Sequence, residues 1–340
     1  MCGGMTHWLR RSRIGLTLTA LIALWFIASL RADSHATRRV SSPRQTLSIT
    51  ADTRLLIVAP HPDDEVLAAG GVIQRVRSVN GVLRIVYLTD GEGYREGVQA
   101  EEHKAVPKPS DYREYGLERK DEARHALRTL GIGSDALTFL GFPNEGLSRL
   151  MTVYWSERRA AYRSPYTRRD RPLKSETIDA DTKFRGEDLT QELAAIIGEF
   201  KPTMILVSRR EDQHVDHCAA WFFVADAMGD VFRVEPGFDA DLITYIIHYY
   251  SWPFETDPPR LDPPPDLSSG VSGWLTVPLT TREMETKRRA LRQYKTQMRV
   301  MDWFLEGFVR RSEIFSRPAT RHVVLPVRRS PCDAFIESHH

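Results

Sequence analysis

The sequence predicts an α/β protein built on a mostly parallel sheet with helices on both faces. Three observations lead to this prediction. Short, continuous apolar runs recur along the chain, as in strands that are buried on both faces. Stretches with apolar residues at helical spacing separate these runs, and this alternation is typical of βαβ units. Two of the runs end in clusters of polar residues, and open parallel sheets bind ligands at such strand ends.

Length and charge leave room for one large domain and exclude some partners. The chain has 340 residues and a formal net charge of +2. Once the N-terminus is set aside, about 300 residues remain, enough for one large α/β domain with a sizeable core. The small net charge argues against a nucleic-acid partner. Cys218 and Cys332 leave room for one disulfide but exclude a disulfide-dense scaffold.

Residues 1–36 have the pattern of a signal peptide or an N-terminal membrane anchor. Three arginines precede the apolar run at residues 14–30, and Ser34–Ala36 resembles a processing site. The run is at the short end for a membrane-spanning helix, so cleavage and retention as an anchor both remain open. We expect an exported protein, periplasmic or extracellular, which residues 14–30 anchor to the membrane if they are retained.

A polar tether at residues 37–52 leads into the domain, which we place at residues 53–330, before a tail at 331–340. The domain opens with the apolar strand Leu55–Ala59, a helix from about Val66, and a second strand over Leu83–Thr89. We then expect a long loop at residues 90–116, a helix at 117–130 and a strand at 136–140. An insertion at 148–185 is expected beside the site that the strand ends form.

The second half repeats the alternation of strand and helix. A helix leads to the apolar strand Thr203–Val207, and another helix follows. The later segments predict a strand, a Pro-rich loop, a short strand and a final helix. The two helices are expected at residues 187–200 and 218–228. The strand is expected at 242–249, the Pro-rich loop at 253–265, the short strand at 274–277 and the final helix at 282–297.

Two polar clusters follow the strands that end at Ala59 and Val207. The first is His61-Pro62-Asp63-Asp64-Glu65, and the second runs from Glu211 to His217. Adjacent carboxylates repel each other in a site shielded from water unless a cation lies between them. Two histidines, one carboxylate and an open position for water are typical of hydrolytic zinc sites, although the same ligands can hold Fe²⁺ or another divalent metal. The sequence therefore predicts a metal site at the carboxyl ends of the strands.

Simpler interpretations exist for each residue alone. Asp63 or Asp64 is a suitable N-cap for the helix that follows, and His214 alone is more typical of a hydrogen-bonded surface histidine. Capping does not explain why both clusters occur at equivalent strand ends. A nucleotide cofactor is not expected, because no Gly-x-Gly-x-x-Gly motif follows the first strand.

The two clusters together resemble the motifs of the PIG-L/LmbE-like N-acetylglucosaminyl deacetylases. That family has a Rossmann-like fold and acts on GlcNAc-inositol, GlcNAc-phosphatidylinositol and related amides. The resemblance spans about Leu55 to Gln297. Weaker similarities lie at Thr89-Asp90-Gly91-Glu92, Arg119-x-x-Glu122, Leu140-Gly141-Phe142-Pro143, Lys287 and Tyr294-Lys295-Thr296-Gln297.

The resemblance implies a role for particular residues. His61, Asp64 and His217 match the metal ligands, with Zn²⁺ as the expected ion. Asp63 matches the general base that takes a proton from the attacking water and hands it to the leaving amine. His214 matches the residue that stabilises the oxyanion of the tetrahedral intermediate.

Further residues are expected around this centre. Asp216 is placed to keep His214 positively charged. Arg119 matches a contact to a sugar hydroxyl, with a solvated helix arginine as the alternative. The chain departs from the family at Asn144-Glu145, where members usually have Asp-Gly, and at Asp212, where mycothiol-pathway relatives carry Tyr. We expect both departures in the substrate pocket, with Asn144 as a substrate contact.

The sequence thus predicts a metal-dependent N-deacetylase, a hydrolase of linear amides, that acts on an N-acetylglucosamine-containing glycan or glycoconjugate. Two alternatives remain: a zinc amidase for a non-sugar N-acyl substrate, and a non-catalytic, exported sugar-binding protein. The expected partner is an N-acetylated sugar, without nucleic acid, and with a membrane if the N-terminal segment is retained. The oligomeric state stays open.

Overall fold

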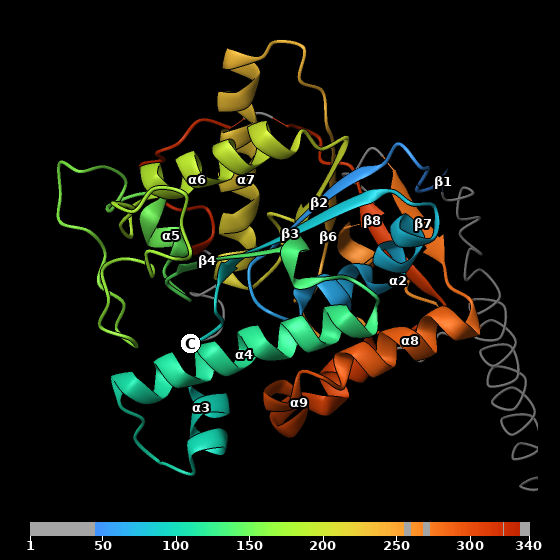
Figure 1. The fold of residues 1–340 in the computed structure, drawn as a ribbon, viewed down its shortest axis with the longest axis horizontal. Coiled ribbons are helices and arrows are strands. Elements are labelled where there is room, and N and C mark those ends of the chain that lie inside the picture. The colour runs from blue at the N-terminus through green and yellow to red at the C-terminus, as the bar shows by residue number, and fades with distance from the viewer. Residues whose placement is uncertain (1–44, 255–259, 268–272, 322, 334–340) are drawn as a thin grey trace, which may run out of the picture. The chain divides into compact units, whose positions relative to one another are not determined.

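The computed structural model describes residues 45–254, 260–267, 273–321 and 323–333 (Figure 1). The expected signal or anchor at residues 1–36 therefore lies outside the described residues, as does most of the expected tail. In the described ranges, none of the helices has the length and apolar character needed to span a membrane.

One sheet of eight strands forms the centre of the domain, in the order β1-β7-β8-β6-β5-β2-β3-β4. Only β8 runs antiparallel to its neighbours, β6 and β7. The α/β class with a mostly parallel sheet is thus confirmed. The strands are β1 (Gln45–Thr46), β2 (Arg54–Ala59), β3 (Val82–Thr89), β4 (Leu137–Phe142), β5 (Met204–Ser208), β6 (Asp241–Tyr245), β7 (Trp274–Pro278) and β8 (Ser312–Ser316).

Strands β2 and β5 are neighbours although about 150 residues separate them, and Val58 pairs with Val207. From β2 the chain continues to β3 and β4 on one side, whereas β5 and β6 lie on the other. The order of the strands therefore reverses between β2 and β5, and a crevice opens at their carboxyl ends. Both polar clusters of the sequence follow these two strands.

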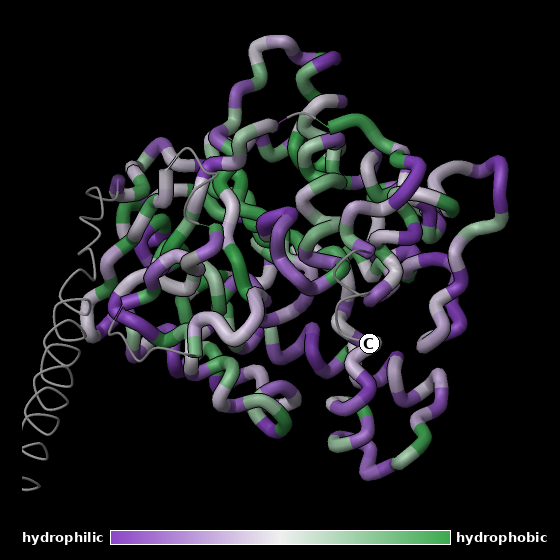
Figure 2. Tube along the Cα trace, turned by 180° about the vertical axis from the view of Figure 1, so that it is seen from behind, coloured by the Kyte–Doolittle hydropathy of each residue, from purple (hydrophilic) through white to green (hydrophobic). Residues whose placement is uncertain are grey.

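Helices cover both faces of the sheet (Figure 1). Alternate residues of β2 point to opposite faces, so that Leu55 and Ile57 join one buried cluster and Leu56 and Val58 the other. The hydropathy colouring follows this arrangement, because the central strands are apolar and the outer loops mostly polar (Figure 2). The helices are α2 (Asp64–Ser78), α3 (Arg95–Glu102), α4 (Pro109–Thr129), α5 (Leu147–Leu150), α6 (Gly186–Phe200), α7 (Val215–Val234), α8 (Thr281–Leu291) and α9 (Lys295–Gly307).

Several expected boundaries were wrong. The long loop expected at 90–116 contains α3 and the first two turns of α4. Helix α4 starts at Pro109, whose missing N–H costs nothing at a first helical position, and Asp111 accepts the Lys108 N–H at 2.7 Å. The single late helix expected over 282–297 is two helices, α8 and α9. Strand β1 lies within the segment expected as a tether, where it pairs with β7.

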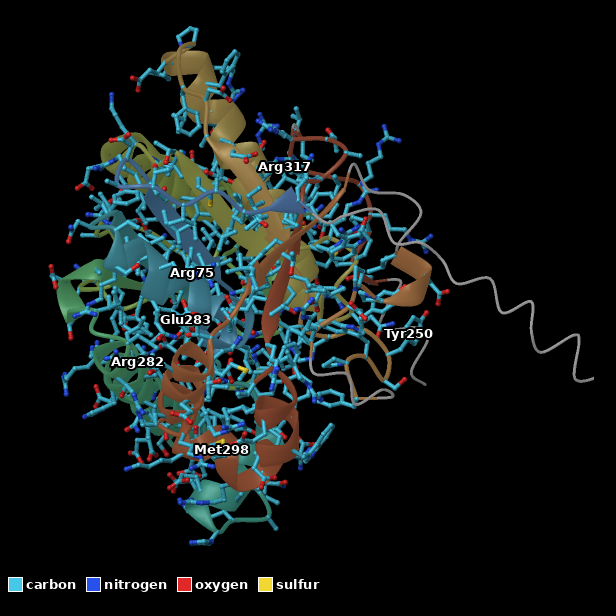
Figure 3. All side chains as sticks on the ribbon, turned by 90° about the vertical axis from the view of Figure 1, so that its right-hand side faces the viewer. Arg75, Tyr250, Arg282, Glu283, Met298 and Arg317 are labelled. Atoms are coloured by element: carbon cyan, nitrogen blue, oxygen red, sulfur yellow. A yellow bond between two sulfur atoms is a disulfide. The ribbon has the colours of Figure 1, made fainter. Side chains whose placement is uncertain are left out.

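Helix α2 is broken at Ala69, whose φ of −136° is not helical. A buried ion pair fills the break. Lys287 Nζ donates to the Leu67 carbonyl and to Glu313 Oε1, both at 2.8 Å, while Glu313 accepts the N–H groups of Gly71 and Val72. The backbone groups released by the break thus find partners. Farther along α2, Arg75 pairs with Glu283 of α8 at 3.0 Å (Figure 3).

A disulfide joins Cys218 on α7 to Cys332, with a Cα–Cα distance of 5.6 Å. It is the single bridge that the spacing of the cysteines left open. The bond attaches the C-terminal segment to the helix that begins beside the second polar cluster.

Candidate metal centre

His61, Asp64 and His217 bring three ligand atoms together at the crevice between β2 and β5. His217 Nε2 lies 3.2 Å from His61 Nδ1 and 3.2 Å from Asp64 Oδ2, and Asp64 Oδ2 lies 3.4 Å from His61 Nδ1. Ligand atoms of a tetrahedral zinc ion, with bonds of about 2.0–2.1 Å, are about 3.4 Å apart. The three atoms therefore fit one divalent ion, and all three side chains are buried.

The backbone between β2 and α2 explains how the neighbours Asp63 and Asp64 point to different places. Asp63 has a φ of 127°, a value that residues with a Cβ rarely adopt. It occupies the N-cap position of α2, but its side chain makes no capping bond. Asp64 Oδ2 instead accepts the His61 N–H at 2.9 Å, which fixes the turn. The capping interpretation thus fails for the side chain of Asp63, which faces the pocket.

Asp212 holds His217 from behind. Its Oδ2 lies 3.2 Å from His217 Nδ1 and accepts the N–H groups of Ile247 and His248. A carboxylate on the far nitrogen of a metal-binding histidine orients the ring and raises its basicity. The expectation that Asp212 lies in the substrate pocket was wrong, because it is fully buried behind the ligand.

His248 belongs to the same cluster, although the sequence did not predict it. Asp64, His217 and His248 form a group whose ligand atoms are close enough for one ion, and so do His61, His214 and His217. The ring of His248 stacks on Phe304, with the ring centres 5.3 Å apart. His248 was not predicted because it falls within the strand expected at residues 242–249. Strand β6 ends at Tyr245, so His248 lies beyond the carboxyl end of a third parallel strand, which was the available signal.

The geometry does not support the expected pairing of Asp216 with His214. The carboxylate of Asp216 accepts the N–H groups of Glu145 and Leu147, and its Oδ2 lies 3.3 Å from His61 Nε2. His214 Nδ1 accepts the backbone N–H of Asp216 at 3.2 Å, which leaves the ring proton on Nε2. Burial, with His61 and His217 nearby, holds the pKa of His214 well below its usual range. Both observations favour the neutral form of His214, and the Asp216 carboxylate contacts His61 instead.

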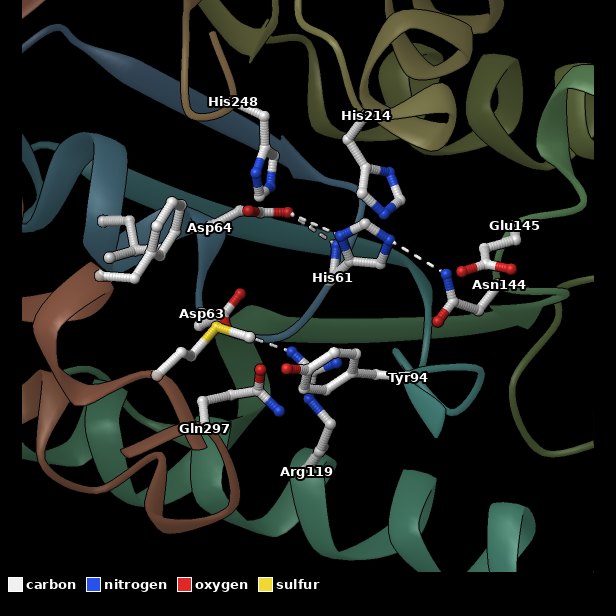
Figure 4. A pocket seen from close by; sticks show the side chains of 13 residues that line it. His61, Asp63, Asp64, Tyr94, Arg119, Asn144, Glu145, His214, His248 and Gln297 are labelled. Atoms are coloured by element: carbon white, nitrogen blue, oxygen red, sulfur yellow. Dashed lines mark hydrogen bonds and ion pairs between the residues drawn. The ribbon is translucent and has the colours of Figure 1, made fainter. Parts of the chain in front are cut away.

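A cavity of about 150 Å³ opens beside the candidate ligands (Figure 4). Arg119 is buried in its wall, so the solvated-helix alternative was wrong. The guanidinium donates to the carbonyls of Gly91 and Pro62 and, at 3.2 Å, to Asp63 Oδ2, while its Nε has no partner. Asn144 also lines the cavity, but its amide is engaged within the protein: Oδ1 accepts the Gly93 N–H, and Nδ2 donates to Asp216.

The two adjacent aspartates differ in charge state. Burial raises the pKa of Asp63 to about 7, although Arg119 opposes this shift. Burial acts in the same direction on Asp64, but the contacts with His217 and His61 outweigh it and hold the pKa of Asp64 well below its usual range. The lowered pKa favours the anionic form of Asp64, which suits a cation, whereas Asp63 can exchange a proton near neutral pH.

The fold and this site define a class: α/β proteins with two histidines and a carboxylate at the point where the strand order of a mostly parallel sheet reverses. The sequence model of the PIG-L family, described as GlcNAc-PI de-N-acetylase, matches residues 56–228, just over half of the chain. The chain belongs to this family of deacetylases, which confirms the resemblance seen in the sequence. A search of curated proteins finds no match.

Solved structures with similar folds include three proteins of low sequence identity. The conserved protein TT1542 from Thermus thermophilus is 21% identical, with a TM-score of 0.48 over 82% of this chain and 98% of its own. The A40926 pseudoaglycone deacetylase Dbv21 is 18% identical, with a TM-score of 0.49 over 78% and 97%. The N,N'-diacetylchitobiose deacetylase from Pyrococcus horikoshii is 18% identical, with a TM-score of 0.46 over 78% and 83%.

Proposed function

We propose that the protein is a metal-dependent hydrolase that removes the N-acetyl group from an N-acetylglucosamine-containing glycan or glycoconjugate. One observation carries the proposal: His61, Asp64 and His217 converge on a position for one ion, and Asp63 lies beside them in the same cavity. Membership of the PIG-L family supports the type of reaction. The name GlcNAc-PI de-N-acetylase, which the family bears, supports an N-acetylated amino sugar as the substrate.

Asp63 acts as the proton acceptor and donor of the proposed reaction. His61, Asp64 and His217 would hold the Zn²⁺ ion, which would supply Lewis-acid chemistry that makes water easier to deprotonate. Asp63 takes the proton of the attacking water, and the same carboxyl group returns it to the nitrogen of the leaving amine. A pKa of about 7 suits both steps, since the group must gain and lose the proton in one turnover.

His214 and Arg119 bind the substrate on either side of this proton transfer. The Nε2–H of the neutral His214 donates to the developing oxyanion, a task that needs a donor but no positive charge. Arg119 lines the cavity, and its guanidinium, which donates to Asp63, can also bind a sugar hydroxyl. Asn144 fixes the wall of the cavity, and Asp216 orients His61.

We further propose that the protein is exported. The arginines and the apolar run of residues 1–36 support targeting to or across a membrane. The disulfide between Cys218 and Cys332 supports an oxidising compartment such as the periplasm, because disulfides are rare in the cytosol. Mass spectrometry of the mature N-terminus and cell fractionation test this proposal. An intact N-terminus in the soluble cytosolic fraction would contradict it.

Acetate release tests the proposed reaction. Purified protein, analysed for its metal content, is incubated with N-acetylglucosamine-terminated glycans and, separately, with N-acyl amino acids. We expect acetate from the glycans, loss of activity with a chelator and recovery with Zn²⁺. Cleavage of N-acyl amino acids alone would favour the amidase alternative. A protein that binds the glycans, and whose metal-loaded form releases no acetate, would be the non-catalytic sugar-binding alternative.

A further inference from the structure

A second and larger cavity lies next to the one that holds the candidate metal centre. It has a volume of about 470 Å³, compared with about 150 Å³ for the first, and Glu145 lines both. Sites for small molecules commonly have volumes of about 300–1,000 Å³, so the first cavity is small for a whole ligand. The second cavity lies between the starts of α3 and α4 and residues 165–168 of the segment expected as an insertion.

Glu145 connects the first cavity to that segment. Its φ of 57° lies in the left-handed region, where glycine is favoured and another residue costs about 1–2 kcal/mol. The side chain of Glu145 accepts a hydrogen bond from the Tyr166 hydroxyl. A strained residue whose side chain serves no purpose would be replaced by glycine at little cost. The hydrogen bond to Tyr166 fixes the Glu145 side chain at the edge that the two cavities share.

Two tyrosines give the second cavity an aromatic wall. The rings of Tyr112 on α4 and Tyr166 have centres 5.2 Å apart and are inclined by 47°. Tyrosine offers a rigid apolar face and one polar tip, and it loses little conformational entropy on binding. Sugar rings present the matching chemistry, with C–H groups on their faces and hydroxyls at their edges.

Charged side chains at the same cavity suit the edges of a sugar. Arg95, Glu96 and Arg168 line it and are exposed. In the described parts of the chain, neither Arg95 nor Arg168 forms a side-chain hydrogen bond or an ion pair, so both guanidinium groups remain available to hydroxyl oxygens. Because Glu96 and Glu145 balance the two arginines, the cavity has no net charge that would select an anion.

We propose that this second cavity is a subsite for a second sugar ring, so that the preferred substrate is an N-acetylated oligosaccharide and not a single sugar. The inference rests on the proposed deacetylase function. The acetylated ring occupies the first cavity, and the glycosidic bond passes Glu145. The neighbouring ring lies on Tyr112 and Tyr166, so the segment 148–185 contributes to the choice of substrate.

The experiment compares acetate release from N-acetylglucosamine, N,N'-diacetylchitobiose and N,N',N''-triacetylchitotriose. We expect kcat/KM to be at least tenfold higher for the disaccharide than for the monosaccharide. In Tyr166→Ala this ratio falls towards one, because the loss is much greater for the longer substrates. Tyr166→Phe keeps the ring and part of the ratio, although it loses the bond to Glu145.

Tyr250→Ala is the matched control, because Tyr250 is 71% exposed on a peripheral loop (Figure 3). We expect this variant to retain the wild-type ratio. Equal kcat/KM for all three sugars in the wild type, or an unchanged ratio in Tyr166→Ala, would overturn the subsite. Failure of the underlying function looks different, since the wild type would then release no acetate from any of the three sugars.

Discussion

Asp63 is the residue in which backbone strain and proposed chemistry coincide. A φ of 127° is unfavourable for aspartate, and residues held in such conformations concentrate at functional sites. The surroundings keep it there: Glu65 accepts its N–H at 3.1 Å, and Arg119 donates to its carboxylate. The strain thus serves to point one carboxylate into the cavity while its neighbour, Asp64, turns to the ligand position.

Replacing Asp63 by asparagine tests the role of its carboxylate. Asparagine tolerates a positive φ and keeps the shape of the side chain, but it cannot accept a proton. We expect kcat to fall by about 10²–10⁴, the usual contribution of a general base. Metal content, measured by atomic absorption, and the melting temperature serve as controls and should stay near the wild-type values. A kcat within threefold of the wild type would exclude Asp63 as the base.

Gly91 controls the position of Arg119. Its φ is +66°, and an added Cβ would overlap Nη1 of Arg119, whose guanidinium also donates to the Gly91 carbonyl. We expect Gly91→Ala to displace the guanidinium from Asp63 and to lower kcat/KM by about tenfold, equivalent to about 1.4 kcal/mol. Gly198→Ala on α6 is the control, because its Cβ would meet no neighbour. Equal activity in both variants would contradict the role of Arg119.

Among the elements, α2 depends most on a contact that is distant in sequence. Its first half carries Asp64, and the break at Ala69 separates this half from the rest. The fully buried pair of Lys287 and Glu313 supplies hydrogen-bond partners to both sides of the break. A Cβ added at Gly71 would displace the Leu279 side chain and touch the Glu313 carboxylate. The position of the candidate ligand Asp64 is therefore coupled to α8 and β8.

Lys287→Met is expected to destabilise the fold strongly. The substitution leaves Glu313 buried without a counter-charge, which costs about 3–5 kcal/mol. Chemical denaturation measures the loss. The control is Arg75→Met, which breaks the partly exposed pair between Arg75 on α2 and Glu283 on α8 and should cost at most about 1 kcal/mol. Similar losses in both variants would show that the buried pair has no special role.

The elements differ in how far the sequence could predict them. Strand β2 was predictable because Leu55–Ala59 is apolar without interruption, as burial on both faces requires. Strand β8 was not, because its sequence, SEIFS, is short and half polar. The partners that allow Glu313 to be buried, Lys287 and the N–H groups of α2, are distant in sequence. The late helix was expected to be continuous, since no proline or glycine marks the break near Tyr294, where the OH group instead bonds Glu65.

At the scale of the whole molecule, the reversal of strand order between β2 and β5 explains why the convergence of the candidate ligands was easier to predict than the contacts around them. His61 follows β2 closely, and His217 lies in the first turn of α7, which comes after β5, so the pairing of β2 with β5 brings the two residues together. The partners of Asp216 and Asp212 depend on loops from elsewhere in the chain. Local sequence carries no trace of such contacts, and for this reason the expected Asp216–His214 pair was wrong. His248 was missed because the strand that ends at Tyr245 was expected to continue to residue 249.

Removal of the metal should lower the stability of the domain. An ion bound only by the folded state stabilises it by about 2.7 kcal/mol at a hundred times its Kd. Without the ion, Asp64 and two histidine nitrogens remain close together in a buried site. We expect the melting temperature to fall after chelation and to rise again with Zn²⁺. If His217→Ala showed the same response to chelation and Zn²⁺, the ion would not bind at this site.

The disulfide should stabilise the whole domain. Cys218 and Cys332 lie 114 residues apart, and a crosslink over such a loop restricts the unfolded chain. We expect the double variant Cys218→Ser, Cys332→Ser to lose about 2–5 kcal/mol in urea unfolding. Wild-type protein under reducing conditions should show a similar loss. Equal stability of the oxidised and reduced protein would indicate that packing alone fixes the C-terminal segment.

The backbone of Asp63 also limits how this position can drift during evolution. Glycine and asparagine are the replacements that a positive φ tolerates best, and neither can transfer a proton. A saturation library at position 63 that is selected only for folding should therefore be enriched in glycine and asparagine variants, which fold but lack catalytic activity. Such descendants would keep the ligands and the cavities while losing turnover, which offers a short mutational route from a deacetylase to a lectin-like receptor.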